Sequence, residues 1–182
     1  MIKKRTIIVL CILIVLLAAA FYIINKWDSL SNIVGMDNDD KSVCLYNGDP
    51  DAISEITVNI PGESYTLVRN NDGDWHIKGQ ENIAVDNTAA NSLAVEVSVI
   101  NAYQLIEKNA SDLSVYGLDN SEYSFSAKTG EETITFVRGD ETPVGSYFYF
   151  KNAESNDVYS QYSSKCTSVF KSLSEYIPGI EE

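Results

Sequence analysis

The sequence predicts an α+β protein in which an N-terminal transmembrane helix precedes an ectodomain of two similar units, each a β-meander followed by a helix. Three observations lead there. Residues 7–24 carry no charged side chain, period-two alternation recurs after them, and a helical pattern follows each set of predicted strands. We expect a cytoplasmic stub and transmembrane segment over residues 1–27, a polar tether over residues 28–42, and an extracytoplasmic domain over residues 43–182.

The apolar run sets the expected location of the chain. A helix rises about 1.5 Å per residue, so the run would span roughly 27 Å, close to the hydrocarbon core of a bilayer. Basic residues at positions 3–5 predict a cytoplasmic N-terminus and a single-pass protein of the cell membrane. An uncleaved signal anchor is the favoured interpretation. A cleaved signal peptide is the alternative, because positions 18–20 are alanines. A lipoprotein is disfavoured, because Leu10 rather than a small residue precedes Cys11.

The charge balance disfavours two classes of partner. The chain has 13 basic and 26 acidic residues, a net charge of −13, so nucleic acid and anionic lipid headgroups would be repelled. The acidic run at residues 37–40 lacks the alternating ligands, the glycine and the closing glutamate of a calcium loop. Cys44 and Cys166 are left open between a disulfide and two free thiols, since an oxidising compartment permits pairing without requiring it.

The first unit is predicted over residues 53–106. A turn at Gly62 joins its first two strands into a hairpin. The predicted strands are residues 53–59, 64–69, 75–77, 83–85 and 103–106. Asp86 is expected to cap a helix over residues 87–101, although the valines at 95, 97 and 99 also alternate as in a strand.

The second unit, over residues 121–177, repeats this plan. Its predicted strands are residues 123–127, 132–138, 147–151 and 157–161. A final helix follows, capped by Ser163 or Ser164. Residues 62–69 resemble residues 130–138, which indicates an internal duplication. Chance similarity between two amphipathic hairpins is the alternative.

Between the units lies a candidate structural corner, Tyr116, Gly117, Leu118 and Asp119. Gly117 is expected to take a backbone angle closed to other residues, which would turn Tyr116 and Leu118 inward.

A tyrosine-rich set is the candidate binding surface. Alternation puts Tyr147 and Tyr149 on one face of a strand and two phenylalanines, the better core candidates, on the other. Together with Tyr159, these tyrosines could form an exposed aromatic surface. Alternatively, they cover the edge of a core with their hydroxyls in water.

No catalytic, cofactor-binding or metal-ligating residue is predicted. The sequence has one histidine, no glycine-rich phosphate loop and no nucleophile elbow.

Several short motifs together resemble the domain-of-unknown-function 4340 (DUF4340) family. The first is Tyr116-Gly117-Leu118-Asp119-Asn120, which resembles a signature of that family. Others, in chain order, are Trp75, Val85-Asp86, Gly139-Asp140, Thr142-Pro143, Gly145, Tyr147-Phe148-Tyr149 and Val158-Tyr159. The resemblance covers about residues 50–178 and departs at Ser121, where the family usually has proline.

The resemblance implies a bacterial, extracytoplasmic α+β domain on a membrane anchor, without established catalytic residues. Some members of the family look like auxiliary parts of ABC-type transport systems, including those linked to gliding motility. We therefore expect a non-catalytic interaction domain with a membrane or envelope protein partner, as an accessory component of a transport or envelope complex. The alternative is a binding module for a cell-wall polymer or small solute that uses the tyrosine surface. An envelope hydrolase is the least favoured reading.

Overall fold

The computed structural model describes residues 42–179, in which strands outnumber helices. The strands are β1 (Val43–Asn47), β2 (Ile53–Ile60), β3 (Glu63–Arg69), β4 (Trp75–Ile77), β5 (Val99–Ala102), β6 (Gln104–Glu107), β7 (Tyr123–Thr129), β8 (Glu132–Glu141), β9 (Tyr147–Asn152) and β10 (Val158–Tyr162). The α-helices are α3 (Asn87–Ser98) and α4 (Ser163–Val169), and short 3₁₀ helices lie at Pro50–Ala52, Ser114–Tyr116 and Leu173–Tyr176.

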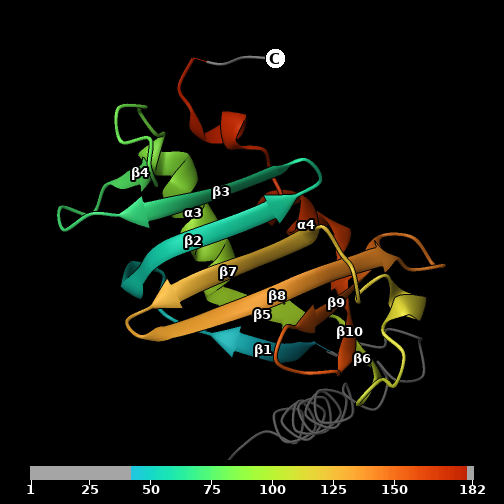
Figure 1. Ribbon diagram of the computed structural model, residues 1–182. Coiled ribbons are helices and arrows are strands. Elements are labelled where there is room, and N and C mark those ends of the chain that lie inside the picture. Colours follow the sequence, from blue (N-terminus) through green and yellow to red (C-terminus); the bar gives the residue numbers. More distant parts are fainter. Residues whose placement is uncertain (1–41, 180–182) are drawn as a thin grey trace, which may run out of the picture. The chain divides into compact units, whose positions relative to one another are not determined.

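Eight of the strands form one antiparallel sheet in the order β4-β3-β2-β7-β8-β9-β10-β6. Two hairpins meet in its middle, because β2 pairs with β7 as well as with β3. Strands β1 and β5 form a separate two-stranded sheet. Figure 1 shows α3 and α4 on one side of the large sheet.

The side of the sheet that faces the helices is apolar, because alternate residues of each strand point to it. From β2, Ile56 is fully buried, and from β7 and β8, Phe125 and Phe136 stack with ring centroids 5.6 Å apart. Leu93 and Val97 of α3 are buried in the same cluster. The main core therefore lies between the sheet and α3.

Helix α3 begins where the sequence predicts and ends earlier. The carboxylate of Asp86 accepts hydrogen bonds from the backbone N–H groups of Thr88 (2.8 Å) and Ala89 (3.2 Å), which confirms the predicted N-cap. The helix stops at Ser98, and Val99 starts β5. Val95 and Val97 therefore lie in the helix, and of the three alternating valines Val99 alone belongs to the strand.

The predicted fold class is wrong. The described residues are mostly β-strand with two α-helices, and the two hairpins belong to one continuous sheet rather than to two separate meander-plus-helix units. The physical reason lies in the strand edges. An isolated meander would leave the outer backbone groups of β2 and β7 unpaired, and the two strands satisfy these groups by pairing with each other.

The accompanying prediction of an N-terminal transmembrane helix is not supported. Neither helix within residues 42–179 is long and apolar enough to cross a bilayer. The predicted span at residues 7–24 and nearly all of the predicted tether lie outside the described residues.

Two smaller expectations also fail. Residues 83–85 form no strand and lead irregularly into α3. Helix α4 starts at Ser163 with Tyr162 in the N-cap position, and no side chain caps it.

The two cysteines of the described residues are unpaired. Cys44 is exposed on β1, whereas Cys166 is buried on α4. Burial raises the pKa of the Cys166 thiol to about 12. Because this folded-state pKa is raised above the unfolded value of about 8.5, the protonated thiol stabilises the fold below that pH. This contribution is lost as the pH rises from there toward about 12.

We expect iodoacetamide at pH 8 to modify Cys44 in the native protein and Cys166 only after unfolding. Cys166 is 2% exposed, so the reagent has no access and little thiolate is present to react. Mass-spectrometric peptide mapping in the presence and absence of denaturant measures each cysteine separately. Equal modification rates for the two thiols in the native state would contradict the burial of Cys166.

Candidate functional site

The corner is built by a 3₁₀ turn that ends in a glycine. Gly117 follows the turn at Ser114–Tyr116 with φ 64° and ψ 25°, a left-handed conformation that favours glycine, as expected from the sequence. Its N–H donates a hydrogen bond to the Ser114 carbonyl (3.1 Å). Leu118 is then buried, while Asp119 stays exposed.

The corner packs directly on a bulge in β8. The register between β8 and β9 shifts between Arg138 and Glu141. A Cβ on Gly139 in this bulge would lie 2.1 Å from the carbonyl oxygen of Tyr116 and 2.9 Å from Leu118. The contact of the corner with β8 is therefore a backbone contact that requires a glycine.

Replacing Gly117 by alanine should destabilise the fold by about 1–2 kcal/mol. This is the usual cost of a left-handed conformation for a residue with a Cβ. The new Cβ would also lie 2.5 Å from the Asp140 carboxyl, which can rotate away. Chemical denaturation of the wild type, Gly117→Ala and Gly117→Asn measures the effect, and asparagine should cost less because it tolerates this conformation better. An unchanged free energy of unfolding in Gly117→Ala would contradict this account.

Tyr116 connects the corner to the tyrosine-rich strands. Its ring lies edge-on to Tyr149, with centroids 4.8 Å apart. Its hydroxyl donates a hydrogen bond to the Glu107 carboxylate, which raises the pKa of Tyr116. Tyr116 is thus half-buried, rather than turned fully into a core.

A hollow of about 280 Å³ lies beside the corner. Gly117, Asp119 and Asp140 line it together with Arg138. The Arg138 guanidinium lies over the ring of Tyr123, 3.3 Å from its centroid, and 4.3 Å from that of Phe148. This stacking explains the half-buried position of an arginine on the apolar side of β8.

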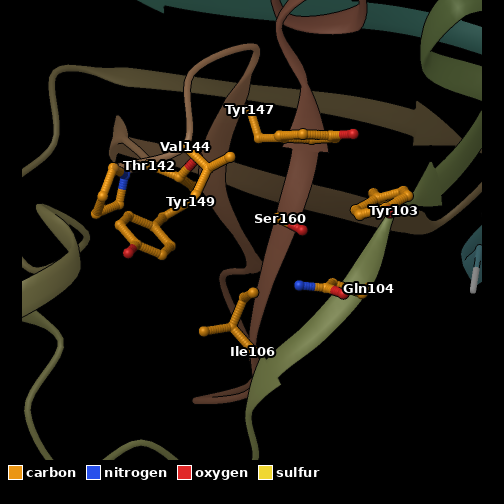
Figure 2. A pocket seen from close by; sticks show the side chains of 9 residues that line it. Tyr103, Gln104, Ile106, Thr142, Val144, Tyr147, Tyr149 and Ser160 are labelled. Carbon is orange, nitrogen blue, oxygen red and sulfur yellow. The ribbon is translucent and has the colours of Figure 1, made fainter.

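A larger groove of about 410 Å³ opens over the strands β9, β10 and β6. Its lining residues are Tyr103, Gln104, Ile106, Thr142, Pro143, Val144, Tyr147, Tyr149 and Ser160. Figure 2 shows Tyr149 and Thr142 on one side of the groove and Tyr103 on the other. Ser160 lies between them on β10, and the Gln104 amide points toward it.

Aromatic packing fixes one end of the groove. The rings of Tyr103 and Tyr147 stack with centroids 4.7 Å apart, and Tyr162 lies 5.4 Å from Tyr103. Desolvation, followed by the neighbouring Tyr103 and Tyr162, raises the pKa of Tyr147. Its hydroxyl therefore stays protonated and uncharged to a higher pH than that of a free tyrosine.

Two hydroxyl groups in the groove lack hydrogen-bond partners among the described residues. These are Oγ of Ser160, a residue that is 3% exposed, and Oγ1 of Thr142. A buried polar group without a partner costs about 1–3 kcal/mol. Both side chains line the groove, so a bound molecule with a donor or an acceptor at these points would remove this cost.

The structure brings together only part of the predicted binding surface. Tyr147 and Tyr149 line the groove, as half-buried residues of β9. Tyr159 of β10 pairs with Phe150 of β9, which is buried. Tyr159 therefore points to the face of the sheet opposite the groove, the same face as Phe150. Phe150 belongs to the main core, which confirms the predicted side for this residue.

Sequence reasoning missed the second wall of the groove. Tyr103 and Gln104 lie more than 40 residues before β9 and β10 in the sequence. They reach the groove because β6 pairs with β10, where Gln104 lies opposite Ser160. The only local signal was an aromatic residue just before a short predicted strand.

The groove offers a concave shape, aromatic surface and hydroxyl groups, and among the described residues no histidine, cysteine or carboxylate lines it. Within residues 42–179, no three His, Cys, Asp or Glu side chains come together as a metal site would require. The aromatic rings and hydroxyl groups of the groove can pack against a bound molecule and form hydrogen bonds with it.

Comparison with known proteins places the chain in a family. A family model described as Domain of unknown function (DUF4340) matches residues 75–164, which run from β4 into α4. No curated protein and no solved structure matches the chain. The matched segment contains both the Tyr116 corner and every residue that lines the groove. The chain is therefore a member of the DUF4340 family.

Proposed function

We propose that this protein is a non-catalytic binding module that works outside the cytoplasm and holds its ligand, a cell-wall polymer or a small solute, in the tyrosine groove. The observation that carries the proposal is the pair of unpartnered hydroxyls, Ser160 and Thr142, in a groove with tyrosine walls. Binding sites of this kind combine mostly apolar walls with a few polar groups that orient the ligand. The location outside the cytoplasm is part of the proposal and rests on the sequence alone, in which basic residues at positions 3–5 precede the uncharged run at residues 7–24.

The groove favours this role over that of an accessory subunit in a transport complex. A stable protein interface requires roughly 800 Å² on each partner, usually with a broad apolar centre. The groove instead offers a local concave site of about 410 Å³, within the range of about 300–1,000 Å³ that is typical of ligand pockets.

Ligand-observed NMR on the full-length protein tests the proposal. A panel of sugars, amino acids, short peptides and solubilised wall fragments should contain at least one ligand that binds the wild type and is lost from Tyr149→Ala. Tyr159→Ala is the matched control, because it removes a half-buried tyrosine from the neighbouring strand but on the other face of the sheet. Thermal melts show whether each variant is folded.

The two variants separate the outcomes. Binding that is lost from Tyr149→Ala and kept in Tyr159→Ala supports the groove as the binding site. A panel without any ligand, or a ligand that both variants bind as the wild type does, would overturn the proposal.

A further inference from the structure

The walls of the groove are uncharged, although the chain as a whole is strongly acidic. Within residues 42–179 no Asp, Glu, Lys, Arg or His lines the groove, in a protein with 26 acidic and 13 basic residues. A charged ligand would leave water for a site without a counter-charge, which is unfavourable. The groove therefore selects for a neutral molecule.

The aromatic walls suit a flat, partly apolar ligand. Tyr149 stands across the groove from Tyr103, with Ile106 at one end (Figure 2). Tyrosine rings combine an apolar face with a hydroxyl that can form hydrogen bonds. The face of a pyranose ring carries C–H groups that pack on such a surface, and its rim carries hydroxyls.

The floor of the groove supplies the polar contacts for such a rim. Ser160 and Thr142 each hold an unpartnered hydroxyl, which can donate or accept. The Gln104 amide, which adds donors and an acceptor, lies opposite Ser160 in the strand pair. Neutral groups of both kinds match neutral hydroxyls, which also donate and accept.

We propose that the groove binds a neutral saccharide, with Tyr149 packing on a sugar ring and Ser160, Thr142 and Gln104 bonding to its hydroxyls. This assignment rests on the proposed function, since it names the ligand class of the same groove. A saccharide is favoured over the other neutral candidate, an uncharged peptide, because a sugar makes more polar contacts per unit of surface.

Isothermal titration calorimetry of the full-length protein with cellotriose, chitotriose and maltotriose tests the assignment. Trigalacturonate, a charged trisaccharide, and an uncharged tripeptide serve as comparison ligands. We expect at least one neutral trisaccharide to bind more tightly than both comparison ligands. Tyr149→Ala should weaken this binding by about tenfold or more, and Ser160→Ala or Gln104→Ala by roughly threefold to tenfold, the effect of one hydrogen bond. Tyr159→Ala should leave it unchanged.

Each result bears on one proposal or on both. Tighter binding of the tripeptide than of any sugar, lost from Tyr149→Ala, overturns the saccharide assignment and leaves the binding module in place. Tighter binding of trigalacturonate overturns the assignment in the same way. The absence of binding for every probe here and in the NMR panel overturns both. Ser160→Ala and Gln104→Ala keep the test decisive if Tyr149→Ala melts at a much lower temperature.

Discussion

Replacing Gly139 by alanine should destabilise the protein by about 3 kcal/mol, because an added Cβ would lie 2.1 Å from the Tyr116 carbonyl oxygen. That atom belongs to the backbone and cannot rotate away, as a side chain could. Leu118, 2.9 Å from the same position, blocks the other direction. The corner must therefore lift from β8, which exposes the small cluster that contains Leu118 and Val158. For a chain of this size, the melting temperature should fall by roughly 6–12 °C.

Gly145→Ala is the matched control for this variant. Gly145 also lies close to the end of β8, but the nearest atom to an added Cβ is the Glu141 carboxylate oxygen at 3.8 Å, and its φ is not positive. We expect its melting temperature to stay within about 2 °C of the wild type, as for most surface substitutions. Equal melting temperatures for the two alanine variants would show that the corner does not rest on Gly139.

Replacing Phe136 by alanine should cost about 3–5 kcal/mol, the usual range for a buried phenylalanine. Phe136 is fully buried, and its ring lies 5.6 Å from that of Phe125 and 5.3 Å from that of Phe150. Alanine would leave a cavity at the centre of a three-ring stack that joins β7, β8 and β9. The rings of Phe125 and Phe150 would each lose a packing partner. The paired strands that carry them cannot move together to close the cavity.

Chemical denaturation of Phe136→Ala and Thr135→Ala measures the free energy of unfolding of each variant. The comparison distinguishes a loss of core packing from a general weakening of β8. Thr135 is the preceding residue of β8, so it points to the other face and is half-buried. Its replacement should cost less than about 1 kcal/mol, the span of strand propensities. Similar losses for the two variants would argue against a core centred on Phe136.

The sequence predicted those features that depend on neighbouring residues. Both hairpins form, with Gly62 in the turn of the first and Gly130 in the turn of the second. Asp86 caps α3 because a capping carboxylate needs only the next few N–H groups of the chain. The side of Phe150 followed from alternation within one strand.

Features that depend on pairing between distant strands were not predictable. The contact between β2 and β7, which joins the hairpins into one sheet, leaves no local pattern. Register has the same property. The register between β9 and β10 pairs Ser160 with Tyr149 and Tyr159 with Phe150, and so decides which face of the sheet each of these β10 residues occupies. Ser160 therefore enters the groove and Tyr159 does not, although the sequence marks the tyrosine more strongly.

The strand order also separates the family match from the folding unit. The matched segment starts at β4, yet among the described strands β4 pairs only with β3, and β7 pairs on one side with β2. A fragment cut at residue 75 would lose both of these neighbours and expose a long, unpaired edge on β7, a common cause of aggregation. The shared family segment thus contains the corner and the groove, whereas β2 and β3, which precede it, pair with β7 and β4 and cover their edges.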